Sequence, residues 1–402
     1  MSRRAIILVP GFSRKERHQS RDRLVRALQH YTDGWRVEQT DEGDGPTTGA
    51  IGLTAAARAG GETREIDVYE AYWGDLVPDW SNESPWARFK RGFFLIRYWL
   101  TGGVRGWLAR GEAPPRAAWA MVIAAFLLIL WWIVVAIFLM QAIGNGTITL
   151  PDSLTQIPVV QTVWNCLTGW TATIGGSVFA LIMLWIWSLG WLEQFSNISA
   201  YTKAYLRDEA LGDDDVGLRA KARHRVLEVL DQVADVHGDK AYDEIYVVGH
   251  SLGGAIAVDA LAECGDLLER VVLFTWGSAL GMLAQQEPLV EQEIAKFYTS
   301  ETRVRSWVDV VFPKDFMGSK VPVPRRFGKD GAPGPSYDML FPGAVAPTLP
   351  KGMHTLELTR IHEAYYRCET AVLMLVQPVT ALPPLPDDPV GAGPRPVAGL
   401  RG

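Results

Sequence analysis

Cysteine is scarce in this sequence, which has three cysteines among 402 residues. Cys166 lies in an apolar region, while Cys264 and Cys368 stand far from each other. This spacing matches neither a disulfide framework nor a cysteine-ligated metal site. Basic stripes are also lacking, and the net charge is only −6. A nucleic-acid-binding domain needs a basic surface, so we expect no nucleic-acid partner.

Charged residues are missing from a long central region. Between Arg116 and Glu193 only Asp152 is charged. The stretches 117–143 and 162–192 are each long enough for a membrane span, which takes about 20 apolar residues. Between them, 144–161 contains Gly, Asn, Thr and Pro, as is typical of a turn. We therefore predict a two-helix transmembrane hairpin. Two buried core helices are the alternative, but such helices are shorter and keep a polar face.

The flanking charges give this hairpin an orientation. Seven basic residues and one acidic residue lie at 84–116, whereas the 144–161 loop has no Lys or Arg. Lys203 and Arg207 follow the second span. The positive-inside rule then places both ends of the hairpin in the cytoplasm. We expect an integral membrane protein with two spans, whose remaining parts face the cytoplasm.

Another apolar pattern lies just before the first span. Phe93, Ile96 and Leu100 recur there at helical spacing, with basic residues among them. The pattern predicts an amphipathic helix. Such a helix lies either on the membrane surface or against a protein core, and the sequence leaves both open.

Strands alternate with helices on both sides of the apolar region. The sequence predicts strands at 4–9, 35–39, 65–72, 244–248, 270–276 and 304–308, and helices at 15–31, 216–237, 251–262 and 363–375. This alternation favours an α/β fold, with a mostly parallel sheet covered by helices on both faces. The Gly-, Thr- and Ala-rich stretch 43–61 is interpreted as a connection between strands.

Four segments follow from these patterns. Residues 1–80 and 201–377 are expected to form the two parts of one α/β domain. Residues 81–200 form the membrane insertion, which contains the amphipathic helix and the hairpin. The proline-rich tail 378–402 should be disordered or extended.

The strongest local motif is Gly-His-Ser-Leu-Gly at 249–253. It stands between an apolar strand and an Ala-rich helix, where a nucleophilic serine occupies a sharp strand-to-helix turn. Gly249 and Gly253 remove side chains that would collide as the helix passes the strand. The N–H of Leu252 then lies at a helix N-terminus, where it can stabilise an oxyanion. The motif predicts Ser251 as nucleophile; the alternative is a Gly/Ser-rich helix start without chemistry.

A serine hydroxyl needs a base, and the base needs an orienting acid. In this kind of fold the chain order is serine, acid, histidine. Two histidines follow Ser251, and we favour His362 over His354 because it immediately precedes the last predicted helix. For the acid we favour Asp309, at the end of a predicted strand, over Asp315.

A second oxyanion donor should come from the loop after the first strand. Pro10-Gly11-Phe12 fits this place, with the N–H of Phe12 as donor and Gly11 allowing the backbone to approach a substrate. A simple tight turn explains the same residues equally well.

These motifs resemble the lipase branch of the α/β-hydrolase superfamily. The segment 249–254, with Asp309 and His362 downstream, is similar to its nucleophile turn and triad. Residues 8–12 look like the oxyanion segment of lipases, although Pro10 stands where many lipases have histidine. The likeness covers about 1–75 and 215–376. The hairpin lies outside it, where some hydrolases place lid elements.

The resemblance implies a membrane-anchored serine hydrolase, similar to lipases and esterases. It would cleave acyl esters, with lipids or small esters as substrates, through an acyl-enzyme and without metal or cofactor. Two alternatives stay open. A thioesterase, peptidase or acyltransferase uses the same triad, and a non-catalytic protein with this fold could recruit partners to the membrane.

Overall fold

The computed structural model shows an α/β protein. The residues that it describes are 2–12, 16–40, 49–80, 82–104, 115–144, 158, 162, 191–211, 215–238, 241–264, 266–297, 304–322, 324, 346–350 and 358–378. The chain divides into two compact units. The first comprises residues 1–78, 106–120 and 204–402, and the second comprises 79–105 and 121–203. Nearly all of the predicted second span, 162–192, and of the tail, 378–402, lies outside the described residues.

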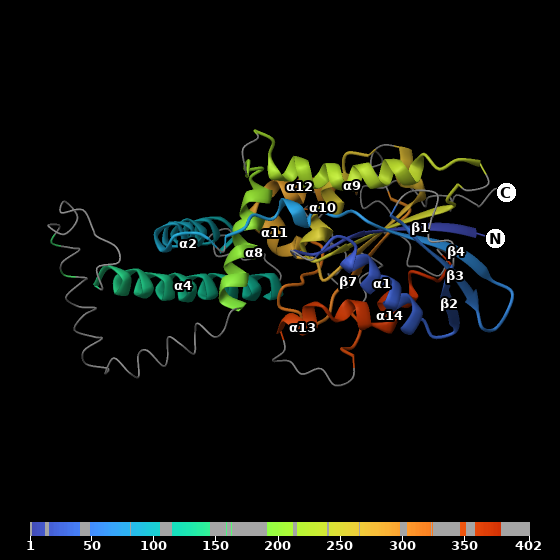
Figure 1. The fold of residues 1–402 in the computed structure, drawn as a ribbon, viewed down its shortest axis with the longest axis horizontal. Helices are drawn as coiled ribbons and strands as arrows, with labels where there is room; N and C mark the ends of the chain where they lie inside the picture. Colours follow the sequence, from blue (N-terminus) through green and yellow to red (C-terminus); the bar gives the residue numbers. More distant parts are fainter. Residues whose placement is uncertain are drawn as a thin grey trace, which may run out of the picture. The chain divides into compact units, whose positions relative to one another are not determined.

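A seven-stranded sheet forms the centre of the first unit (Figure 1). Its strands are β1 (Ser2–Val9), β2 (Trp35–Gln39), β3 (Ile51–Ala57), β4 (Thr63–Glu70), β5 (Glu244–His250), β6 (Val271–Trp276) and β7 (Ser306–Val310). Their order is β2-β3-β4-β1-β5-β6-β7. The strands from β4 to β7 are parallel, and β2 and β3 are antiparallel additions at one edge. The predicted α/β class with a mostly parallel sheet is therefore confirmed.

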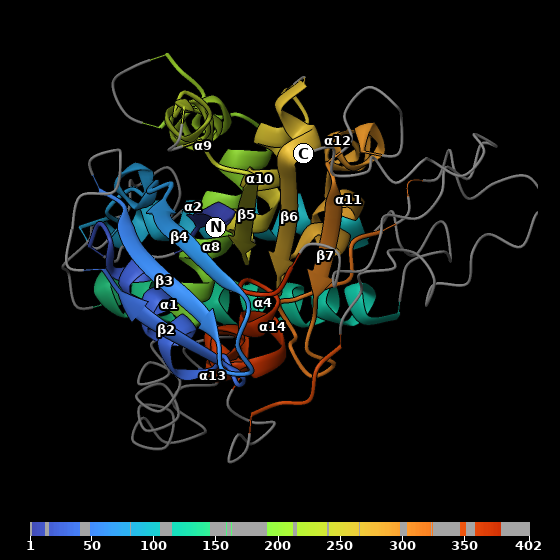
Figure 2. The same ribbon diagram turned by 90° about the vertical axis from the view of Figure 1, so that its right-hand side faces the viewer.

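Helices cover both faces of this sheet (Figure 2). They are α1 (Gln19–His30), α9 (Leu218–Ala234), α10 (Leu252–Leu261), α11 (Leu280–Gln286), α12 (Pro288–Lys296), α13 (Leu358–His362) and α14 (Glu369–Leu373). Helices α1, α13 and α14 pack on one face, and α9 and α10 contact β1 and β5 on the other. Because the central strands are buried on both faces, they are continuous apolar runs. Ile6, Ile7 and Leu8 of β1 are fully buried.

Two local predictions differ from the structure. Strand β3 lies within the stretch 43–61, for which the sequence predicts a connection between strands. Its Gly, Ala and Thr residues carry little strand propensity, and pairing with β2 and β4 is what holds them extended. The predicted last helix, 363–375, is divided into a 3-10 helix, Ala364–Arg367, and α14.

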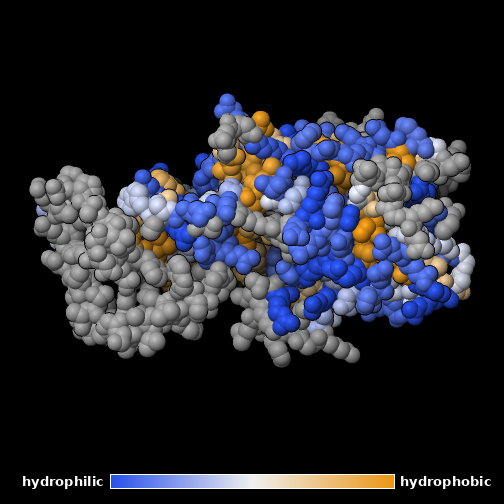
Figure 3. Space-filling model, viewed as in Figure 1, coloured by the Kyte–Doolittle hydropathy of each residue, from blue (hydrophilic) through white to orange (hydrophobic). Residues whose placement is uncertain are grey.

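The antiparallel edge of the sheet is solvated on one side. In β2, Trp35 and Val37 are buried while the residues between and after them are exposed. On the face drawn in Figure 3, the surface over α1 and these edge strands is mainly hydrophilic. This alternation is typical of antiparallel strands that cover a core on one side only.

The second unit contains α2 (Pro85–Trp99), a π-helical turn at Leu100–Val104, and most of α4 (Pro115–Gly144) and of α8 (Trp191–Leu206). A side chain on Gly92 would collide with Trp131, so α2 approaches α4 closely there. Within the residues whose side chains are described, no helix is both long and apolar enough to cross a membrane.

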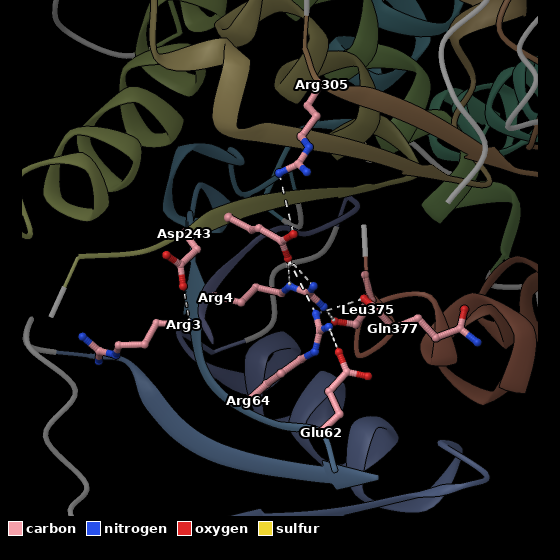
Figure 4. A network of polar contacts seen from close by, with 9 residues as sticks. Arg3, Arg4, Glu62, Arg64, Asp243, Arg305, Leu375 and Gln377 are labelled. Carbon is pink, nitrogen blue, oxygen red and sulfur yellow. Dashed lines mark hydrogen bonds and ion pairs between the residues drawn. The ribbon is translucent and has the colours of Figure 1, made fainter. Parts of the chain in front are cut away.

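An ion-pair network joins the starts of the parallel strands to the C-terminal segment (Figure 4). Arg4 is 1% exposed, and its guanidinium lies 3.9 Å from the centre of the Tyr246 ring. Its Nε donates to Glu244 over 3.0 Å, and its Nη1 donates to the carbonyl of Leu375 over 2.6 Å. Arg64 and Arg305 approach the same Glu244 carboxylate at 3.8 and 3.7 Å.

Substitution of Arg4 tests how much this network contributes to the stability of the fold. We expect Arg4→Met to lower the free energy of unfolding by about 3 kcal/mol, because it removes one partner of a buried ion pair. Arg36→Met is the control: the Arg36 side chain is 71% exposed and pairs with Glu38, so its loss should stay within about 0.5 kcal/mol. Thermal and denaturant unfolding would compare the two, and equal losses would contradict the network's importance.

Candidate functional site

Ser251 occupies a strained turn between β5 and α10. Its backbone has φ 56° and ψ −126°. Among the described residues other than glycine, only His18 and Asp208 also have positive φ. Such a conformation costs about 1–3 kcal/mol and persists where surrounding structure enforces it. Here the Ser251 N–H donates to the carbonyl of Trp276 over 2.9 Å, which ties the turn to β6.

Steric constraints explain why both motif positions, Gly249 and Gly253, are glycine. A Cβ on Gly249 would lie 2.5 Å from the Cα of Gly254, and a Cβ on Gly253 would collide with the carbonyl of Val9. Helix α10 therefore starts in contact with the ends of both β1 and β5. Leu252, the first residue of α10, is 4% exposed.

The loop after β1 lies against the serine turn. A Cβ on Gly11 would lie 3.0 Å from the Cβ of Ser251, so only glycine allows this approach. Trp73 fixes the loop, because its Nε1 donates to the carbonyl of Pro10 over 3.0 Å and its ring lies 6.5 Å from that of Phe12. The structure thus brings the loop of Phe12 and the turn of Leu252, the predicted oxyanion donors, to the same place.

His362 pairs with Asp315. The Nδ1 of His362, the last residue of α13, lies 2.8 Å from Oδ2 of Asp315, and both side chains are buried. A carboxylate accepts, so Nδ1 carries the proton. The other ring nitrogen, Nε2, is buried and has no hydrogen-bond partner among the described residues. Its lone pair is therefore available to accept a proton.

Further donors surround the Asp315 carboxylate. Oδ2 also accepts from the hydroxyl of Tyr365 over 2.8 Å, and Oδ1 accepts from the N–H of Met317 over 3.0 Å. Burial acts to raise the pKa of Asp315, but His362, the Tyr365 hydroxyl and the N–H of Gly318 hold it below its ordinary value. For His362, burial acts to lower the pKa, and the Asp315 charge raises it above 6.5.

Asp309, the acid favoured from the sequence, does not contact His362. Its Oδ1 accepts from the hydroxyl of Thr275 over 2.6 Å, and its Oδ2 accepts from the N–H of Val321 over 3.0 Å. Burial raises its pKa to about 6. The strand β7 runs to Val310, so Asp309 lies inside the strand rather than after it.

The structure therefore brings Asp315, the second choice from the sequence, to His362 and does not bring Asp309 there. After β7 the chain turns, with the N–H of Asp315 donating to the carbonyl of Phe312 over 3.0 Å. This turn carries Asp315 to His362. The alternative base, His354, lies outside the described residues.

Two contributors were not predicted from the sequence. Tyr365 stands three residues after His362, and this spacing is the only sequence sign of its contact with Asp315. His250 lies within the serine motif, and its Nε2 lies 2.8 Å from the carbonyl oxygen of His362. In the part of the chain that the structure describes, no group of three or more His, Cys, Asp or Glu residues could hold a metal ion.

Comparisons of the chain with protein-family models, with curated proteins and with solved structures found no significant match.

The backbone strain at Ser251 makes a prediction about stability. Ser251→Gly and Ser251→Ala both remove the hydroxyl, but only glycine adopts this backbone without a Cβ conflict. We expect Ser251→Gly to be more stable than Ser251→Ala by about 1 kcal/mol. At Ser20, in the regular helix α1, we expect the opposite: Ser20→Ala should be more stable than Ser20→Gly by about 1 kcal/mol. Denaturant unfolding would give the free energies of the four variants. If the glycine variant were the more stable one at both positions, or the less stable one at both, the result would contradict backbone strain at Ser251.

Proposed function

We propose that this chain is a serine ester hydrolase of the α/β-hydrolase type. Ser251 is the nucleophile, His362 the base and Asp315 the orienting acid. The observation that carries this proposal is the buried His362–Asp315 pair, in which Nε2 of His362 is free to accept a proton. His362 also contacts His250, the residue just before Ser251. The parallel sheet with the serine turn after a central strand supports the resemblance to lipases.

The first half-reaction forms an acyl-enzyme. Nε2 of His362 takes the hydroxyl proton of Ser251 as Oγ attacks the ester carbonyl carbon. The resulting imidazolium is stabilised by the Asp315 carboxylate, which already accepts from Nδ1. The N–H groups of Leu252 and Phe12 hold the oxyanion, and the positive end of the α10 dipole adds to their effect.

The second half-reaction releases the acid. When the tetrahedral intermediate collapses, the C–O bond to the alcohol breaks and His362 gives its proton to the leaving oxygen. His362 then takes a proton from water, which attacks the acyl carbonyl. A second collapse breaks the bond to Ser251 Oγ, and the serine recovers its proton.

The same proposal includes anchoring in a membrane through the predicted hairpin, with the hydrolase domain facing the cytoplasm and lipid esters as substrates. The support comes from α4, which has no charged residue after Arg116. Its described part exposes large apolar side chains, among them Ile123, Phe126 and Ile133, at spacings of three and seven residues along one face. Such a face suits hydrocarbon rather than water.

A fluorophosphonate probe tests both the hydrolase activity and the membrane anchoring. Membranes from cells that express the full chain are washed with alkaline carbonate and treated with a fluorescent probe. We expect a labelled band in the pellet for the wild type and for Ser20→Ala, a buried serine outside the site. Ser251→Ala should abolish the band, because the probe reacts only with an activated serine.

The outcomes separate the two parts of the proposal. A folded wild-type chain without label would overturn the hydrolase and favour the recruitment role. A labelled band that moves into the carbonate supernatant would keep the hydrolase and overturn the anchoring.

The acid assignment makes a kinetic prediction. We expect Asp315→Asn to lower kcat for a chromogenic ester by about 10⁴-fold, because the asparagine no longer stabilises the imidazolium or its tautomer. Asp309→Asn, an equally buried substitution, should change kcat by less than about tenfold.

The wild-type pH profile checks the same pair. Because Asp315 raises the pKa of His362, the rate should rise with pH through a midpoint above 6.5, as the imidazole loses its proton. A larger loss in Asp309→Asn than in Asp315→Asn would contradict the assignment.

A further inference from the structure

His250 lies where three segments of the site meet. It is the last residue of β5 and directly precedes Ser251. Its backbone is fixed in the sheet opposite Trp276 of β6, and its side chain is buried. The ring Nε2 lies 2.8 Å from the carbonyl oxygen of His362, the last residue of α13.

This contact sets the state of the imidazole. A carbonyl oxygen only accepts, so Nε2 of His250 must carry the hydrogen. Burial, reinforced by the neighbouring His362, lowers the pKa of His250 to about 3, so the ring is neutral. Nδ1 then has no proton and lies against the loop after β1, where a Cβ on Gly11 would be 2.8 Å away.

Aromatic rings fix the orientation of the imidazole. The His250 ring centre lies 5.1 Å from that of His362, 5.9 Å from Tyr365 and 5.3 Å from Tyr366. Tyr366 in turn lies under the guanidinium of Arg23 at 4.5 Å. A ring with this many neighbours has one orientation, and its Nε2–H points to one acceptor.

The acceptor needs a partner from outside its helix. Helix α13 ends at His362, and the last carbonyls of a helix lack donors from a following helical turn. His250 supplies one such donor. The hydrogen bond joins the residue before the nucleophile directly to the residue proposed as the base.

We propose that His250 is a positioning residue for the reaction. Its Nε2–H holds the backbone of His362 so that the imidazole, with its free Nε2, keeps one position relative to Ser251. This inference rests on the proposed hydrolase function. Asp315 fixes the Nδ1 side of the His362 ring, and His250 fixes the main chain that carries it.

Two fixed points are needed because catalysis is sensitive to small displacements. A shift of about 1 Å between reacting groups can lower a rate by about 100-fold. With Asp315 alone, the His362 ring could still pivot about the Nδ1 hydrogen bond. The backbone contact removes that freedom, and because it comes from the neighbour of Ser251, it fixes base and nucleophile relative to each other.

Three substitutions of His250 distinguish positioning from packing. Glutamine places an amide N–H near the position of Nε2, asparagine places one only near Nδ1, and leucine has none. We expect His250→Gln to keep kcat within about threefold. His250→Asn and His250→Leu should lower kcat by about 100-fold with KM unchanged. The number of Ser251 sites that the probe labels at saturation gives the concentration of folded enzyme.

Each result has a distinct meaning. Rescue by glutamine alone, with equal melting temperatures for the three variants, supports the positioning role. Equal kcat losses in all three, or no loss in any of them while the wild type is labelled, overturn the positioning role and leave the hydrolase intact. Absence of labelling in the folded wild type overturns the hydrolase and this role together.

Discussion

The site depends on how closely helix α10 approaches the ends of β1 and β5. Gly249 and Gly253 leave no Cβ between the helix and the strands, and the carbonyl of Val9 occupies the space that a side chain would need. The turn is then too short for ordinary backbone angles, and Ser251 adopts φ 56°. All residues of α10 are buried, so packing of the whole helix maintains the strain of one residue.

A second level of order comes from polar contacts between distant segments. Asp315 follows β7, and His362 precedes α14. Besides their mutual hydrogen bond, Asp315 accepts from Tyr365, and the carbonyl of His362 accepts from His250. Asp309, which does not contact the base, joins Thr275 of β6 to the N–H of Val321, at the far end of the loop that carries Asp315. Asp309 thus connects β6 to the segment that follows Asp315 in the chain.

The sequence indicates the parts of the site that are local. Ser251 and its glycines lie in one short motif whose sterics are set by neighbours in the chain, and the alternation of apolar runs predicts the parallel sheet. The sequence favours Asp309 over Asp315, whereas Asp315 is the residue that pairs with His362, because this pairing depends on where β7 ends and how the next turn closes. Strand β3 was missed because pairing, not propensity, makes it extended. The transmembrane hairpin stays a prediction.

The Arg4 network has a consequence for how the protein folds while it is being synthesised. Strand β1 lies at the centre of the sheet, yet its partner Glu244 is 240 residues later in the chain and Leu375 is 371 residues later. During synthesis, the guanidinium of Arg4 lacks its Glu244 partner until more than half of the chain has emerged, and it lacks the Leu375 carbonyl until nearly all of the described chain has emerged. Folding dominated by such distant contacts is slow. The last contact of Arg4 therefore forms only when the segment 358–378, which also carries His362, is present.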